Sequence, residues 1–332
     1  MTDTILRSFQ FRQEREASWQ QLESLLEQVN RRSANSLTDE ELLAIPALYR
    51  AALSSLSVAR ATSLDKALIE YLEALSARAY FFVYGPRSTI GERIGGFFTE
   101  RWPNAVRGLW RETLVSFFLT LAGVLAAYFL VLNDPDWFFS LVPGDLAGGR
   151  TPHASAETLR DVLYHPPEAS SMLSVFATML FTHNAQVALF AFALGFALCV
   201  PTALLTIYNG SSLGAMFAVY GAKGLGFEFG GWIFIHGVTE LFAIILAAAA
   251  GLRIGWSIAF PGERTRLGAA AEAGKEGGAI MVGVVIMLFI AGLLEGIARQ
   301  VITVDWARWS IAMFTLLAWM TYFYAPWQRV KR

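Results

Sequence analysis

Two ionisable side chains stand four residues apart in the otherwise apolar stretch FIHGVTELF, residues 234–242. Because four residues make about one helical turn, His236 and Glu240 would project from the same face of a helix. An ionised carboxylate in hydrocarbon costs at least about 2.5 kcal/mol on membrane-insertion scales. We therefore expect both side chains to face the inside of a helical bundle, where they would be paired or protonated.

Other polar residues lie at the ends of neighbouring apolar runs. His183 and Asn184 precede one such run, and Glu295 lies near the end of another. If the chain crosses the membrane six times, the runs that start at His183 and His236 both enter from the outer side, and the run that carries Glu295 ends there. The sequence therefore predicts one cluster in the outer third of the bilayer, made of His183, Asn184, His236, Glu240 and Glu295.

Three kinds of chemistry fit such a cluster. The first is a buried polar network that fixes helix register. The second is a metal or hydrolytic site, since zinc accepts histidine and carboxylate ligands, and its candidate ligands are His183, His236, Glu240 and Glu295. The third is a binding groove or a path for protons or solutes, which intramembrane ionisable groups often mark. The zinc-protease motif H-E-x-x-H is absent from the sequence, as is any recognisable nucleophile motif. No other cofactor is expected.

Composition places this cluster in a membrane protein. Of 332 residues, 55% are hydrophobic and only 16% are charged, and the mean hydropathy is +0.45. A net charge of −1 without a long basic run argues against nucleic acid as a partner. The single cysteine, Cys199, excludes an intrachain disulfide. The first sixteen residues lack the apolar segment of a cleavable signal peptide, so we expect the N-terminus in the cytoplasm.

The sequence divides into a soluble part and a membrane part. In residues 1–105, apolar residues recur at three- and four-residue spacings, which predicts a small cytoplasmic bundle of amphipathic helices and a juxtamembrane segment. Residues 106–332 predict an all-α polytopic membrane domain of five or six spans. The predicted spans are 113–132, 185–208, 229–252, 277–298 and 309–327, with a weaker, glycine-rich segment at 211–228 that would be a short span or a re-entrant hairpin.

The distribution of arginines predicts the orientation. Five of them, Arg87, Arg93, Arg101, Arg107 and Arg111, precede the first span, whereas residues 133–170 hold six acids and two bases. By the positive-inside rule the bundle is cytoplasmic and 133–170 is extracytoplasmic. The basic end of the chain, residues 329–332, also belongs inside. Two short motifs predict tight turns at the cytoplasmic face, Asn209-Gly210 and Pro261-Gly262.

The chain resembles a known family along nearly its whole length. The resemblance is carried by FRQEREASWQQLESLL, EELLAIPALYRAALSSLSVARA and LEALSARAYFFVYG in the first part, and by THN, YNGSSLGA, FIHGVTELFAI, AAAGLRIG, FPGERTR and LLEG in the second. These motifs resemble the stage II sporulation protein M family of bacterial membrane proteins, in a long form with an N-terminal bundle. The positions that match family motifs include the five cluster residues and both turn motifs.

The resemblance implies a scaffold. In spore formers, the short family member belongs to a membrane complex with a peptidoglycan-degrading enzyme and a second membrane protein. For this chain we expect a non-enzymatic scaffold or assembly factor of cell-envelope processes in the bacterial inner membrane, with the lipid bilayer and other membrane or envelope proteins as partners; a sporulation role is not transferred. The alternative is an intramembrane enzyme or transporter that uses the His/Glu cluster. The sequence does not predict the oligomeric state.

Overall fold

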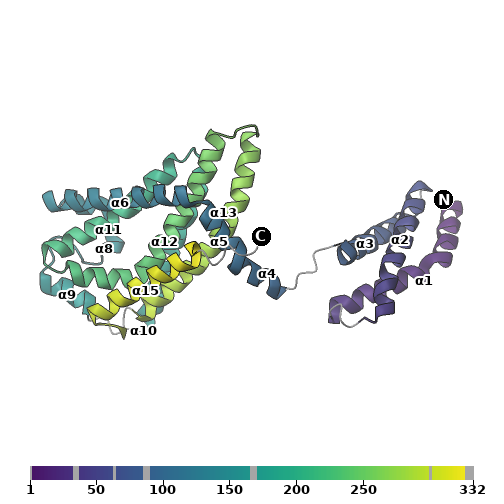
Figure 1. The fold of residues 1–332 in the computed structure, drawn as a ribbon, viewed down its shortest axis with the longest axis horizontal. Helices are drawn as coiled ribbons and strands as arrows, with labels where there is room; N and C mark the ends of the chain where they lie inside the picture. Colours follow the sequence, from purple (N-terminus) through teal and green to yellow (C-terminus); the bar gives the residue numbers. More distant parts are fainter. Residues whose placement is uncertain are drawn as a thin grey trace. The chain divides into compact units, whose positions relative to one another are not determined.

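The computed structural model describes residues 2–32, 37–62, 65–84, 90–164, 170–298 and 301–325. Regular structure in these ranges is helical (Figure 1), so the all-α prediction is confirmed. The chain forms two compact units, Met1–Arg93 and Ile94–Arg332. The boundary lies earlier than the predicted 105/106, because Trp102 packs into the core of the second unit. Arg87 and residues 329–332, which the predicted orientation uses, lie outside the described residues.

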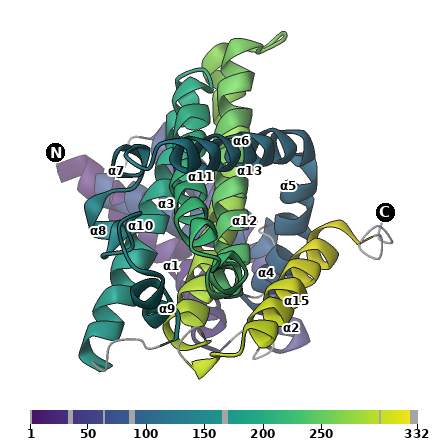
Figure 2. The same ribbon diagram turned by 90° about the vertical axis from the view of Figure 1, so that its left-hand side faces the viewer.

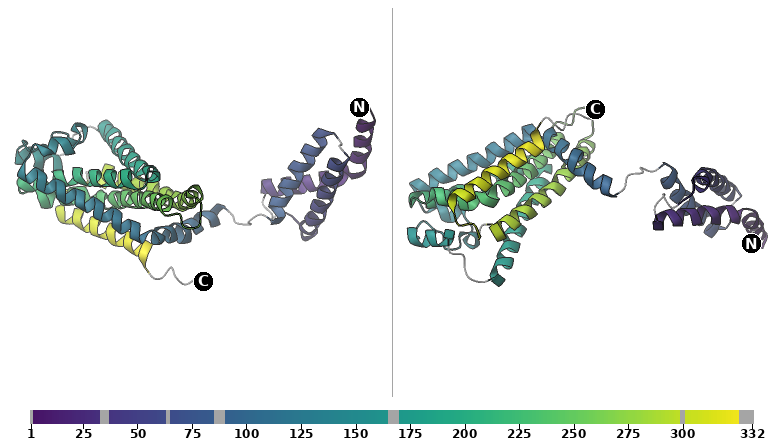
Figure 3. Two further views of the ribbon diagram at one scale, coloured as in Figure 1. Left: turned by 90° about the horizontal axis from the view of Figure 1, so that it is seen from above. Right: turned by 60° about the horizontal axis from the view of Figure 1, so that its bottom comes forward.

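Three amphipathic helices build the N-terminal unit (Figure 3): α1 (Thr2–Arg32), α2 (Asp39–Ala61) and α3 (Lys66–Tyr84). The α2 helix begins with a reciprocal capping box, in which the Thr38 hydroxyl accepts from the Glu41 amide and the Glu41 carboxylate accepts from the Thr38 amide. One face of each helix is buried in a shared core whose largest members are Trp19, Leu22, Ile45, Leu68, Leu72 and Leu75.

Five helices of the described chain are long and apolar enough to cross a membrane, judged by length and composition only: α2, α6 (Trp110–Asn133), α11 (Val200–Ala222), α12 (Gly226–Ala259) and α13 (Arg266–Leu293) with the π-helical turn η4 (Leu294–Ala298). The α2 helix differs from the others, since its apolar face is already buried against α1 and α3. The remaining four lie in the second unit, and the protein is a multi-pass α-helical membrane protein.

Helix directions in the second unit follow from close contacts. Gly210 and Gly214 of α11 lie against the backbones of Thr120 and Val124 of α6, so these two helices are parallel. The α10 helix (Ser170–Ala193) and α15 (Asp305–Tyr324) are both parallel to α12. The α12 and α13 helices form an antiparallel hairpin, whose turn projects at the top of Figure 2. The six long helices of this unit therefore alternate in direction along the chain.

Two predicted spans were wrong. A span at 185–208 was predicted, but α10 ends at Ala193, a 3-10 turn follows (η3, Leu194–Phe196), and α11 starts at Val200. At this break Leu198 and Cys199 have positive φ, and Pro201 occupies the first turn of α11, where its missing amide does no harm. The segment 211–228 is neither a separate span nor a re-entrant hairpin. It contains the end of α11, a turn and the start of α12.

The predicted turn at Asn209-Gly210 was also wrong, because both residues lie inside α11. Gly210 serves helix packing: a Cβ there would lie 2.3 Å from the carbonyl oxygen of Thr120. The predicted turn at Pro261-Gly262 is confirmed between α12 and α13, and Gly262 has φ +63°, the left-handed conformation that glycine adopts most easily.

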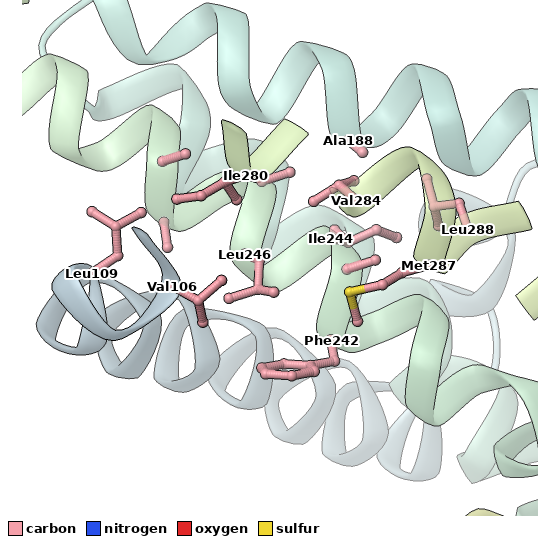
Figure 4. Close-up of a cluster of buried hydrophobic side chains, with 14 of the residues drawn as sticks. Val106, Leu109, Ala188, Phe242, Ile244, Leu246, Ile280, Val284, Met287 and Leu288 are labelled. Carbon is pink, nitrogen blue, oxygen red and sulfur yellow. The ribbon is translucent and has the colours of Figure 1, made fainter. Parts of the chain in front are cut away.

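The core of the second unit lies where α12 meets α13 and α5 (Trp102–Gly108). Figure 4 shows Phe242, Ile244 and Leu246 of α12 between Val106 and Leu109 on one side and Ile280, Val284, Met287 and Leu288 of α13 on the other. Trp102 is 2% exposed and surrounded by aromatic rings of α15. This packing holds α5, α13 and α15 against α12, the helix that carries His236 and Glu240. Two short segments, α4 (Ile90–Gly96) and η2 (Phe97–Arg101), precede α5.

The segment after α6 covers one end of the second unit with three short helices, α7 (Trp137–Leu141), α8 (Gly144–Ala147) and α9 (Ala156–Tyr164). Arg308 of α15 is fully buried here and donates to the carbonyls of Ile302 and Leu163, at 2.7 and 2.9 Å. The Tyr164 hydroxyl donates to Asp305 at 2.7 Å. These bonds fasten the end of α9 to the start of α15.

Candidate functional site

A cavity of about 370 Å³ opens in the second unit between α10, α11, α12, η4 and the segment around α8. Its wall combines apolar and polar groups, the composition typical of a ligand site. All five residues of the predicted polar cluster line it: His183, Asn184, His236, Glu240 and Glu295. The structure therefore brings together residues that are up to 112 positions apart along the chain, counted as 295 − 183.

Three elements present these side chains. His236 and Glu240 are one turn apart on α12, which is fixed on several sides by α6, α13 and α15. Glu295 lies in η4, where the helix widens to the π form; single π turns of this kind are frequent at functional sites. Since α12 and α13 are antiparallel, the end of α13 lies beside the first third of α12. His183 and Asn184 reach the same cavity from α10.

The closest part of the site is a group of three residues. The Nε2 atom of His236 lies 3.6 Å from Oε1 of Glu295. One side-chain donor atom each of His236, Glu240 and Glu295 lies within 4.8 Å of the others. His236 is 3% exposed and Glu295 5%, whereas Glu240 is half-buried. This group could hold a metal ion. His183, also predicted as a ligand, lines the cavity outside this group.

The sequence did not single out Arg150, which also lines the cavity. Its Nε donates to the carbonyl of Ala147 at 3.0 Å and an Nη to that of Leu146, while its guanidinium lies 5.7 Å from the centre of the Trp232 ring. Burial lowers the pKa of Arg150. A signal existed, since Arg150 is one of only two bases in residues 133–170. It gives the cavity wall a cation, which interacts electrostatically with Glu295.

The α11 helix contributes further polar groups that sequence reasoning missed or misplaced. Tyr208, Asn209 and Ser212 line the cavity, and Ser212 donates to the carbonyl of Leu141 at 2.9 Å. Asn209 was predicted as a turn residue and instead faces the site from within a helix. Pro261 and Gly262 lie at the far end of α12 and take no part in the cavity.

Each of the two parts of the chain matches a known protein family or domain. A family described as stage II sporulation protein M matches residues 116–298, and a domain of unknown function, DUF8413, matches residues 9–85. Curated proteins and solved structures gave no match. The first match contains the whole polar cluster and covers more than half of the chain. This protein therefore belongs to the stage II sporulation protein M family.

Proposed function

We propose that the protein is a non-enzymatic membrane scaffold that gathers other membrane or envelope proteins. The second unit would anchor the assembly in the bilayer, and the N-terminal unit would hold partners. This division of work fits a chain whose two units have separate hydrophobic cores, so that one unit can engage a partner without disturbing the packing of the other.

The observation that carries this proposal is an exposed aromatic surface on α3. Tyr80, Phe81 and Tyr84 are 50%, 71% and 65% exposed. Their rings lie against one another, with centroids 5.9 Å apart for Tyr80 and Phe81 and 5.3 Å apart for Tyr80 and Tyr84. Tyr84 also touches the edge of the core, since its ring lies 6.0 Å from that of the buried Tyr49, whereas most of the surface of all three rings is exposed. Exposed aromatic side chains that cluster are typical of protein interaction sites, where tyrosine is enriched.

The orientation belongs to the same proposal. We place the N-terminal unit and the end of the chain in the cytoplasm, and α7–α9 outside, in a bacterial inner membrane. Arg101, Arg107, Arg111 and Arg253 support this, since they surround the start of α6 and the neighbouring part of α12 and cytoplasmic loops concentrate arginine. Ser57 and Ser140 are exposed on opposite predicted sides.

Cysteine labelling tests the orientation in a Cys199→Ser background. In intact spheroplasts an impermeant maleimide should label Ser140→Cys, while Ser57→Cys should be labelled only after lysis. The reverse pattern would overturn the orientation and would leave the scaffold proposal to the following experiment.

Partner capture tests the scaffold. The full-length protein would be cross-linked in native membranes, purified and examined by mass spectrometry, beside the triple variant Tyr80→Ser, Phe81→Ser, Tyr84→Ser. The matched control replaces three exposed apolar residues of α2 instead, Leu43, Leu53 and Val58, with serine. We expect the α3 variant to lose its cross-linked partners at least about tenfold, as loss of roughly 1.4 kcal/mol or more would produce, and the α2 variant to keep them. If the α3 variant and the α2 variant retained equal amounts of cross-linked partner proteins, the proposal would be wrong.

A specific observation also supports a second candidate function. The 370 Å³ cavity is large enough for several water molecules, each of which takes about 30 Å³ in the liquid, and it exposes a half-buried carboxylate. A buried network that only fixed helix register would need no such space. Binding of a ligand within the second unit is therefore the alternative that the site favours.

A further inference from the structure

We propose that His236, Glu240 and Glu295 bind one divalent transition-metal ion at the wall of the cavity, and that Zn²⁺ suits the set best. This inference concerns the chemistry of the cavity and does not depend on the scaffold role. Its failure would leave partner capture by the N-terminal unit untouched.

The distances between the donor atoms fit a shared ion. Zinc binds histidine nitrogen and carboxylate oxygen at about 2.0–2.2 Å, so two ligands of a tetrahedral ion lie roughly 3.4 Å apart. The His236 Nε2 to Glu295 Oε1 distance is 3.6 Å. No pair of donor atoms in the group exceeds 4.8 Å, a gap that a small side-chain rotation of the half-buried Glu240 closes.

Charge favours the same conclusion. Two carboxylates and an imidazole share a site in which two of the three residues are at most 5% exposed. Buried carboxylates must be neutralised by protons, by cations or by a metal. Arg150 on this cavity wall interacts electrostatically with Glu295, but its single positive charge can balance only one of the two carboxylates. A divalent ion would balance both carboxylates with histidine neutral, the form that binds metal.

The ligands stand on a rigid frame. The four-residue spacing of His236 and Glu240 on α12 is the spacing by which two ligands on one helical face hold zinc in other proteins. The α12 helix packs against five long helices, α6, α10, α11, α13 and α15. Glu295 is held beside it by the antiparallel α13. Because packing fixes the helices that carry the three ligands, only the Glu240 side chain has to adjust when the ion binds.

The proposed ion would keep an open position. Zinc sites that only stabilise structure use four protein ligands, while sites that bind or activate other molecules use three. This group supplies three ligands and borders the cavity, which also contains His183, Asn184 and Asn209. The fourth ligand would be a water molecule or an oxygen atom of a molecule that enters the cavity.

Metal uptake by the full-length protein in detergent tests this site. The chelator-treated protein would be equilibrated with Zn²⁺, freed of excess metal and examined by elemental analysis, with Co²⁺ as a spectroscopic probe in a parallel sample. We expect about one Zn²⁺ per chain, and a visible Co²⁺ spectrum that Zn²⁺ abolishes. Loss of a group that only hydrogen-bonds to a metal ligand weakens metal binding about 10–100-fold. Glu240 and Glu295 would be ligands themselves, so Glu240→Gln and Glu295→Gln should weaken Zn²⁺ binding at least about tenfold.

The controls are a histidine and a glutamate outside the cavity, His153→Ala and Glu157→Gln, which should bind Zn²⁺ like the original protein. Gel filtration and melting of each variant report folding. If a glutamine variant fails to fold, the Zn²⁺ and Co²⁺ titration of the unmodified protein still decides. Absence of stoichiometric uptake by the unmodified protein would overturn the proposal, as would equal Zn²⁺ affinity in the folded Glu240→Gln variant. The second result would identify Glu240 as a hydrogen-bonding residue of a polar network.

Discussion

The two units of this protein are both helical bundles, yet they pack by different means. The N-terminal core consists of large side chains such as Trp19, Leu22 and Leu72, which fill the space between three helices. In the second unit, small residues let helix backbones touch. Positions 247–250 are four buried alanines, and a Cβ on Gly214 would lie 2.0 Å from the carbonyl oxygen of Val124.

The difference follows from the solvent of each unit. In water, burial of a leucine side chain contributes roughly 1.5–3 kcal/mol, so large side chains drive helices together. In lipid, the hydrocarbon around a helix is as apolar as leucine itself, and association depends on close van der Waals contact and hydrogen bonds between helices. A helical bundle in water is therefore stabilised by large apolar side chains in its core, while a helical bundle in lipid is stabilised by close approach of the helix backbones.

The largest expected effect is that of one methyl group between α6 and α11. Gly214→Ala would force the two backbones apart. Overpacking that side chains can relieve costs typically about 1–3 kcal/mol, but here the obstacle is backbone, so we expect a cost above the roughly 2–5 kcal/mol of a core truncation. We expect loss of most folded protein, measured by fluorescence-detected gel filtration and melting in detergent. Gly278→Ala of α13 is the control, since a Cβ there meets no atom within 4 Å. Equal melting temperatures of the two variants would contradict the view that close contact between the α6 and α11 backbones stabilises this unit.

How much of the fold the sequence could predict depends on the role of glycine, which differs between a helix in water and a helix in lipid. Helical spacing predicted the N-terminal bundle of amphipathic helices, and long apolar runs predicted the positions of α6, α12 and α13. Gly210 was interpreted as a turn residue because in water Asn-Gly marks a turn. In the second unit it marks contact with Thr120. The uninterrupted apolar run at 185–208 likewise concealed the break between α10 and α11.

The candidate site was more predictable than the helix boundaries. An ionisable group must avoid lipid wherever its helix starts or ends, and the convergence of His236, Glu240 and Glu295 needs only the hairpin of α12 and α13. Arg150 and Asn209 could not be placed, because their positions depend on how α8 and α11 pack, and no local pattern encodes that packing.

The second expected effect is a truncation in the N-terminal core. Leu72 is 0% exposed, and Leu72→Ala should destabilise this unit by about 2–5 kcal/mol through lost burial and a remaining cavity. Hydrogen exchange by mass spectrometry of the full-length protein should show faster exchange in α1–α3 alone, since the units have separate cores. Leu43→Ala, on an exposed leucine, is the matched control. Faster exchange in α12 would show that the units fold together.

A smaller effect is expected at the helix caps, which both units expose to water. Thr38 caps α2 and Thr265 caps α13, where its hydroxyl accepts from the Gly268 amide at 3.1 Å. Loss of such a cap costs about 1 kcal/mol. Thr38→Ala should cost more than Thr265→Ala, because Thr38 belongs to a reciprocal capping box. Local hydrogen exchange of the first helical turns measures both. Equal costs would show that the Glu41 bond adds nothing.

The smallest expected effect concerns two tyrosines that donate to carboxylates, one in each unit. Burial, together with the hydrogen bond to Glu23, raises the pKa of Tyr71 to about 12, and burial with the bond to Asp305 raises that of Tyr164 to about 12. The folded state therefore favours the neutral phenol. Its contribution to stability is complete below the ordinary tyrosine pKa near 10 and is lost as pH rises through about 12. Both rings are only partly buried, so solvent screens these bonds and the effect should be small.

Tyrosinate absorbance at high pH would follow these groups. Tyr71→Phe should remove one late-ionising tyrosine and reduce the pH dependence of stability of the N-terminal unit between about pH 10 and 12, while Tyr164→Phe should do the same for the second unit. If both bonds act locally, the two substitutions should have additive effects, as expected for distant sites. A non-additive result would show that the loss of the Tyr71 hydrogen bond changes the stability of the second unit. The two cores would then not be independent of one another.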